Sequence, residues 1–170
     1  MMKKIAVQEI KEKVAELCLK ANFILRPDVL AALKRAYAGE KNRKARNILE
    51  AVIQNAAIAG KEKLAICQDT GMACVFVELG DAVEVKGDLK KAINAGVAQG
   101  YKKGFLRESI VSDPLRRGKA GYAPAIIHID LVKGNKLRLT VLPKGFGCEN
   151  KSRLKMFKPT AGIEEVKEFV

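Results

Sequence analysis

The sequence is poor in aromatic residues, cysteine pairs and long apolar runs, and each shortage excludes a class of protein. Aromatic residues make up only 5% of the 170 positions, so no aromatic and basic platform for stacking nucleic-acid bases can be recognised. The four cysteines include no CxxC pair, which argues against a zinc ribbon or a thioredoxin-like redox site. No stretch of about eighteen apolar residues occurs, so a transmembrane helix is not expected.

The first residues also lack a targeting signal. Met1–Ile5 contains two lysines but shows neither the apolar core nor the small-residue cleavage site of a signal peptide. We therefore expect a cytoplasmic protein without membrane association, in which the cysteines stay reduced and are available as ligands.

A large positive charge stands out in the composition. The formal net charge is +13 at pH 7, yet the lysines are spread through every segment and interleaved with glutamate. Such a distribution is typical of solvated helix faces and does not favour nucleic acid as a partner. A basic surface also attracts small dicarboxylates or an acidic partner subunit.

Apolar residues recur at helical spacing through much of the chain. This pattern predicts a first amphipathic helix at about 5–22 and a second from Pro27 to Gly39. A third helix is predicted to follow and to end at Gly60, and a fourth runs from a cap at Asp88 to Gly104. Cys18 lies on the apolar stripe of the first helix and is interpreted as a core residue. Two shorter helices are expected near the C-terminus, one from about Asn150 to Pro159 and one from Gly162.

Alternating β-branched residues predict strands in the second half. Residues 124–132 and 137–141 flank a turn at 133–136, which we interpret as a hairpin. The expected fold is α+β, with a helical N-terminal half packed on a small, largely antiparallel sheet that has this hairpin near 124–142. We expect a helical lobe at about 1–60 and a sheet-containing lobe at about 61–170.

One polar stretch interrupts an apolar, strand-like run. Cys67-Gln68-Asp69-Thr70-Gly71 places a thiol, an amide, a carboxylate and a hydroxyl between Leu64–Ile66 and Met72–Val77. An unpaired polar group in a buried strand costs about 1–3 kcal/mol, so these groups must be satisfied by one another, by a cofactor or by a substrate. The alternative is a tight turn in which the polar side chains bond the backbone and the thiol is a small apolar filler.

Three stretches together resemble one enzyme family. Cys67–Gly71 is similar to the CQDTG signature of the class I, iron–sulfur fumarate hydratases and the related tartrate dehydratases. Ala123–His128 is similar to the TPAxIH-like strand of that family, and Pro143–Ser152 is similar to its PKGGGSEN segment. The resemblance runs over nearly the whole chain. It implies that residues 1–170 are the N-terminal part of an alpha-type hydro-lyase domain.

The resemblance also implies a 4Fe–4S cluster held by three cysteines, with one open iron that acts as a Lewis acid. Cys67 matches a cluster ligand. Cys148 stands where many relatives have serine, and the second ligand of the family lies a few residues upstream, where this chain has Val141-Leu142-Pro143. We interpret Cys148 as its replacement, the alternative being a small buried residue in a tight loop. The third cysteine is expected outside this chain, which therefore looks truncated.

The same resemblance implies roles for other side chains. Gln68, Asp69 and Thr70 match the catalytic stretch, with Gln68 contacting substrate and Asp69 bonding its hydroxyl or moving a proton. Arg107 begins a long irregular segment and matches an arginine that grips a substrate carboxylate, although a surface ion pair is the alternative. Lys144 is expected to place a substrate-binding charge beside the glycine-rich loop.

Two residues with reactive side chains are not assigned to the site. Cys74 follows the polar stretch on a strand and is interpreted as a core residue. His128, the single histidine, lies between two isoleucines and is interpreted as a residue of a strand face.

Two functional hypotheses follow from the sequence. The leading one is reversible hydration of fumarate to malate, a step of the tricarboxylic acid cycle, with tartrate dehydration as a close alternative. The competing one is an inactive basic interaction module, which the missing third cysteine and the high charge favour. As an enzyme, the chain is expected to need a beta-type subunit or a C-terminal domain as partner, to form an oligomer and to be inactive alone.

Overall fold

The computed structural model describes residues 2–115, 117–149 and 151–170, with the side chains of residues 148 and 149 outside that description. Its elements are, in chain order, β1 (Lys3–Ala6), α1 (Val7–Phe23), α2 (Pro27–Gly39), α3 (Arg43–Glu62), β2 (Met72–Gly80), β3 (Val83–Lys86), α4 (Leu89–Lys103), β4 (Ile126–Val132), β5 (Leu137–Lys144), α5 (Phe146–Glu149) and α6 (Ile163–Phe169). Helices and strands combine in an α+β fold, as the sequence predicts. None of the helices in these ranges is long and apolar enough to cross a membrane.

Strand β2 lies at the centre of the larger sheet. Among the described residues this sheet has the order β4-β2-β5, with β4 parallel and β5 antiparallel to β2. Ala73, Val75 and Val77 on one face of β2 are buried, and an apolar strand of this kind is stable in the centre, where it loses most contact with water. A smaller sheet pairs β1 with β3 in parallel.

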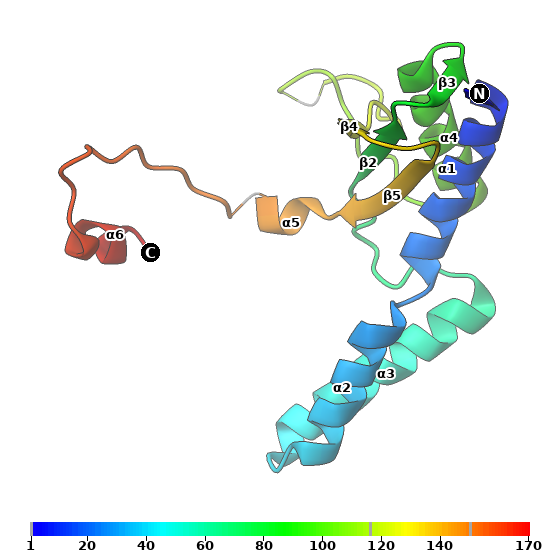
Figure 1. The fold of residues 1–170 in the computed structure, drawn as a ribbon. Coiled ribbons are helices and arrows are strands. Elements are labelled where there is room, and N and C mark those ends of the chain that lie inside the picture. Colours follow the sequence, from blue (N-terminus) through cyan, green and yellow to red (C-terminus); the bar gives the residue numbers. More distant parts are fainter. Residues whose placement is uncertain (1, 116, 150) are drawn as a thin grey trace.

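The core forms where α1 and α4 pack side by side against the larger sheet (Figure 1). Val14 and Cys18 of α1 and Ile93 of α4 are fully buried there. The prediction of Cys18 as a core residue is confirmed, and burial raises the pKa of its thiol to about 12. Gly96 of α4 permits this close packing, because a Cβ atom there would lie 2.5 Å from the carbonyl oxygen of Lys11.

Helices α2 and α3 form a two-helix arm that projects from the rest of the molecule (Figure 1). Asn42 caps α3, since its side-chain oxygen accepts hydrogen bonds from two backbone N–H groups of the first turn. The helix continues past the predicted stop at Gly60, and Lys63 takes the left-handed conformation that ends it. The division of the chain into a helical and a sheet-containing lobe stays a prediction.

The predicted hairpin near 124–142 is wrong in its strand pairing. Both strands and the turn between them lie close to their predicted positions, but β2 separates β4 from β5. The connection at 133–136 crosses the end of β2, where the N–H of Gly80 donates to the carbonyl oxygen of Lys136 (2.9 Å). Turn residues indicate where strands end, but they do not indicate which strands pair. β2, which has Ala73, Val75 and Val77 buried in the core, lies between β4 and β5. The sheet is also not largely antiparallel, because β4 runs parallel to β2.

Two local predictions are wrong as well. Lys3–Ala6 forms β1 rather than the beginning of the first helix, because its backbone pairs with β3. The helix expected from Asn150 onward is not found in residues 151–158, and Asn150 itself lies outside the described residues. Leu154 and Met156 are 87% and 84% exposed, so a short amphipathic helix here would have no surface to pack against.

Candidate functional site

The Cys67–Gly71 loop joins α3 to β2 and is anchored just before its polar residues. The N–H of Ile66 donates to a carbonyl oxygen of α1 (2.9 Å), and the Asn55 side chain donates to the Ile66 carbonyl (2.9 Å). Gly71 ends the loop at a φ of 55°, and a side chain there would collide with the backbone of β5. The polar residues are thus held between the helices and the sheet.

Thr70 links this loop to the segment that carries Arg107. Thr70 is 3% exposed, and its Oγ1 accepts a hydrogen bond from the Arg107 N–H (3.0 Å). Its carbonyl oxygen accepts a hydrogen bond from the Tyr101 hydroxyl (3.0 Å). Burial raises the pKa of Tyr101, so the hydroxyl remains a donor at neutral pH. Thr70 therefore positions Arg107, and a direct catalytic role for Thr70 stays a prediction.

Asp69 links the same loop to the glycine-rich turn after β5. Its Oδ2 accepts a hydrogen bond from the Gly147 N–H (3.1 Å). A Cβ atom at Gly145 would come within 2.9 Å of the same oxygen, so the turn approaches closely because this residue is glycine. Hydrogen bonds from the N–H groups of Gly147 and Phe146 hold the pKa of Asp69 below its usual value, and the Arg107 charge acts in the same direction.

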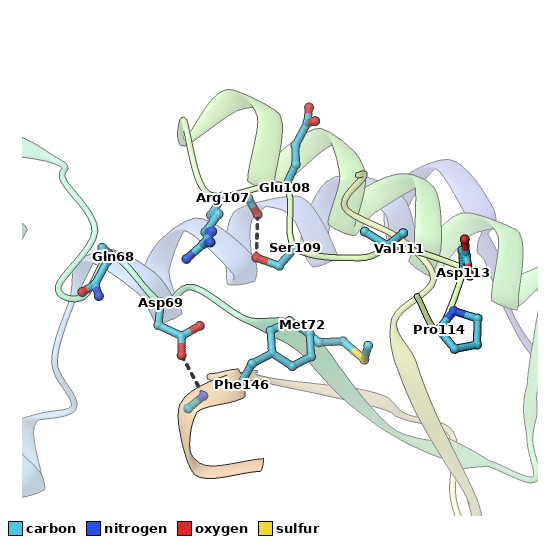
Figure 2. Close-up of a pocket in the computed structure, with 11 residues that line it drawn as sticks. Gln68, Asp69, Met72, Arg107, Glu108, Ser109, Val111, Asp113, Pro114 and Phe146 are labelled. Carbon is cyan, nitrogen blue, oxygen red and sulfur yellow. Dashed lines mark hydrogen bonds between the residues drawn. The ribbon is translucent and has the colours of Figure 1, made fainter. Parts of the chain in front are cut away.

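These contacts border a cleft with a volume of about 590 Å³, within the usual range for small-ligand sites. Figure 2 shows the Arg107 side chain extending toward the Asp69 loop, while the Asp69 carboxylate points toward its hydrogen-bond partner Gly147. The residues that line the cleft are Gln68, Asp69, Met72, Arg107, Glu108, Ser109, Val111, Asp113, Pro114, Phe146 and Gly147. Three of the residues that the sequence assigns to the site, Gln68, Asp69 and Arg107, are thus brought together.

The remaining predicted site residues are not among those that line the cleft. Cys67 is exposed, and its Sγ lies 3.5 Å from Oε1 of Gln68. Lys144, at the end of β5, is not part of the described lining. The backbone of Cys148 belongs to α5, directly after the Gly147 N–H that binds Asp69, but its side chain lies outside the described residues. The prediction that the thiols of Cys67 and Cys148 share a cavity stays a prediction.

The sequence of this chain matches the family model described as fumarate hydratase (Fumerase) over residues 11–170. The chain belongs to the fumarate hydratase family. This match confirms the family that the CQDTG stretch indicates, and with it membership of the alpha-type hydro-lyases.

Similar proteins carry the name of a related hydro-lyase. A Methanocaldococcus jannaschii protein with the provisional name L(+)-tartrate dehydratase subunit alpha is 35% identical over 170 residues, covering 95% of this chain and 59% of the relative. L(+)-tartrate dehydratase subunit alpha of Escherichia coli is 28% identical in strain UTI89 and 27% in strain K12, each over 97% of this chain and 56% of the relative. The chain spans less than two thirds of the length of these relatives.

This member of the fumarate hydratase family contains some of the side chains that an iron–sulfur cluster needs as ligands. Cys67 offers an exposed thiol next to Gln68, which is one of the residues that line the cleft. Within the described parts of the chain, however, no group of three or more His, Cys, Asp or Glu side chains is arranged to hold a metal. Cys74, interpreted from the sequence as a core residue, is buried, and burial raises the pKa of its thiol. Among the described residues, Cys67 is therefore suited to be one ligand of an iron–sulfur cluster, but a complete set of ligands is not present.

Several cleft residues were not singled out by the sequence. Met72 and Phe146 give the cleft an apolar side, and Ser109 and Asp113 add polar groups. The carboxylate of Asp113 accepts hydrogen bonds from Arg117 Nε (2.7 Å) and the Leu115 N–H (2.9 Å). The length of the irregular segment after Arg107 was the available signal for Ser109 and Asp113, because long loops in compact domains are often functional.

Replacing Thr70 tests the link to Arg107. Thr70→Val keeps the shape but leaves the Arg107 N–H without its acceptor, and should lower the free energy of unfolding by about 1–3 kcal/mol. Thr70→Ser keeps the hydroxyl and should lose less. Urea unfolding measures the stability, and hydrogen exchange of the Arg107 amide should accelerate in Thr70→Val only. Equal exchange in both variants would show that the hydroxyl is not the acceptor.

The lowered pKa of Asp69 predicts a pH dependence of stability. A carboxyl whose pKa falls on folding adds stability above its unfolded pKa of about 3.9, and this stability is lost as the pH drops through the lower folded value. The wild type should therefore lose more stability than Asp69→Asn between about pH 5 and pH 2, measured by urea unfolding at each pH. Parallel curves for the two proteins would contradict the proposed charge-assisted hydrogen bonds.

Proposed function

We propose that this chain is part of an alpha-type hydro-lyase subunit that adds water reversibly to the double bond of a four-carbon dicarboxylate. Fumarate hydration to malate is the leading reaction. The observation that supports it is the cleft that Gln68, Asp69 and Arg107 line, with the exposed Cys67 next to Gln68 in the chain. The names of the relatives favour the dehydration of tartrate as the second candidate.

Arg107 is proposed to hold one substrate carboxylate. Its guanidinium presents a planar fork of donors that matches a carboxylate with two parallel hydrogen bonds. Thr70 fixes the backbone of Arg107, so the point from which this side chain extends into the cleft is held by a hydrogen bond. The high positive charge of the chain would help to draw in a dianionic substrate. Lys144 is retained as a further candidate for this attraction.

Asp69 is proposed to orient the substrate hydroxyl. Its lowered pKa keeps it ionised at neutral pH, and an ionised carboxylate accepts hydrogen bonds from hydroxyl groups or from water. A carboxylate with a low pKa is a weak base. The role proposed for Asp69 is therefore to orient the substrate hydroxyl, or the water that adds, by accepting a hydrogen bond from it. Gln68, at the same border of the cleft, offers an amide that can donate to a second substrate oxygen.

The cofactor proposed for this site is a 4Fe–4S cluster, with Cys67 and Cys148 as two of its ligands. When bound, such a cluster supplies a Lewis-acidic iron to the substrate. Because the described donor set is incomplete, the remaining ligand and further catalytic groups are proposed to come from residues outside this sequence and from a beta-type subunit. A cytoplasmic location is proposed with it, because the thiol ligands must stay reduced.

Reconstitution tests this proposal. The chain alone, supplied with iron and sulfide without oxygen, should retain little cluster, since too few thiolates are available. Joined to the remaining segment of its longer relatives and co-expressed with a beta-type subunit, it should show the absorbance of a cluster and hydrate fumarate. Cys67→Ser should abolish the cluster absorbance in this assembly. Asp69→Asn should keep the cluster and lose about 10²-fold or more in rate.

Cys18→Ala is the matched control, because Cys18 is a buried thiol of the core and should not affect the cluster. Both fumarate and tartrate are assayed, and turnover of tartrate alone would select the second candidate. An assembly whose cluster and activity are unchanged in Cys67→Ser would contradict the hydro-lyase proposal.

A further inference from the structure

Tyr101 is a core residue that forms hydrogen bonds with both segments that border the cleft. Its hydroxyl donates to the carbonyl oxygen of Thr70 (3.0 Å), and its own carbonyl oxygen accepts a hydrogen bond from the N–H of Leu106 (2.9 Å). Leu106 directly precedes Arg107, whose N–H donates to Thr70 Oγ1 (3.0 Å). The three hydrogen bonds and the chain between them form a closed ring, which fixes the Arg107 segment relative to the loop of Thr70.

The ring of hydrogen bonds lies inside the protein. Tyr101 is 1% exposed, and Thr70 and Leu106 are also buried, so water does not compete for these contacts. Asn22 of α1 is buried beside them, and its Nδ2 donates to the carbonyl oxygen of Cys18 (2.8 Å). Burial raises the pKa of Tyr101, and a hydrogen bond with the Asn22 side chain acts in the opposite direction. The Tyr101 hydroxyl is therefore held between α1 and the loop.

The turn from α4 to Arg107 contains a strained residue. Phe105 has a φ of 51°, in the left-handed region that favours glycine, and it is 96% exposed, so packing of its side chain does not explain this conformation. The hydrogen bond from the Leu106 N–H to the Tyr101 carbonyl closes the turn, an arrangement that ends many helices with glycine at the strained position. Such strain persists only where the surrounding contacts impose it. The ring of hydrogen bonds provides these contacts.

We propose that Tyr101 is a positioning residue that sets the separation of Asp69 and Arg107, and with it the length of the dicarboxylate that the cleft accepts. This inference rests on the proposed function, in which Arg107 holds a substrate carboxylate and Asp69 orients the hydroxyl. Asp69 directly precedes Thr70, and its carboxylate points toward Gly147 and not toward Arg107 (Figure 2). Arg107 therefore takes the carboxylate that is remote from the hydroxyl carbon. A single CH₂ group separates that carbon from this carboxylate in malate, and the five-carbon homologue 2-hydroxyglutarate has one more.

Removal of the Tyr101 hydroxyl in the assembled enzyme tests the proposal. Tyr101→Phe keeps the aromatic ring in the core but leaves the Thr70 carbonyl without its donor, so the separation of the two binding groups is no longer fixed. Isothermal titration with malate and with 2-hydroxyglutarate gives the ratio of the two affinities. The wild type should prefer malate by about 10- to 200-fold, and Tyr101→Phe should reduce this preference by about fivefold or more. A variant that only lowered the amount of folded enzyme would leave the ratio unchanged.

Tyr37→Phe is the matched control, because it removes the same hydroxyl from α2 in the projecting arm and should keep the ratio of the wild type. Tyr101→Phe combined with Thr70→Val should change the ratio no more than the stronger single variant does, because both substitutions break the same ring. An unchanged ratio in Tyr101→Phe, in an assembly that hydrates fumarate, would overturn this inference and leave the proposed function intact. A wild-type assembly that binds neither acid would contradict the proposed function, and this inference with it.

Discussion

Two side chains of one loop, the Asp69 carboxylate and the Thr70 hydroxyl, connect three segments that are distant in the sequence. Asp69 accepts a hydrogen bond from the N–H of Gly147 in α5, and Thr70 accepts one from the N–H of Arg107 in the segment after α4. Each contact joins a side chain to a backbone group, so it fixes the course of the partner segment and not only a side-chain position. The cleft exists because these two contacts bring their segments to the same side of the sheet.

The cleft is supported by the packed core of the protein. Tyr101 is buried in α4 between α1 and the sheet, and its hydroxyl reaches the carbonyl oxygen of Thr70. β2 continues directly from the loop into the centre of the larger sheet. The loop is therefore held on rigid elements at both ends, an arrangement that keeps a binding group in place within small tolerances. The arm and residues 151–170, in contrast, project from this core (Figure 1).

The features predicted from the sequence are those with a local cause. Asp88 caps α4 as expected, since a helix start depends on a few neighbouring residues, and the polar interruption at Cys67–Gly71 indicates a site because buried polar groups need partners. The position of β2 between β4 and β5 was not predictable in this way, because strand order depends on pairing between segments that are distant in the sequence. The contact between Thr70 and Arg107 spans 37 positions, and no local pattern reveals it.

Binding of a dicarboxylate to the assembled enzyme tests the central claim that the cleft between Asp69 and Arg107 is the substrate site. Isothermal titration with malate should show affinity reduced by about tenfold or more in Arg107→Lys, because lysine cannot offer the planar pair of donors. Arg138→Lys, a change of the same kind on the face of the sheet, should bind as the wild type does. Equal affinity of the wild type and Arg107→Lys would contradict the assignment of the substrate site to this cleft.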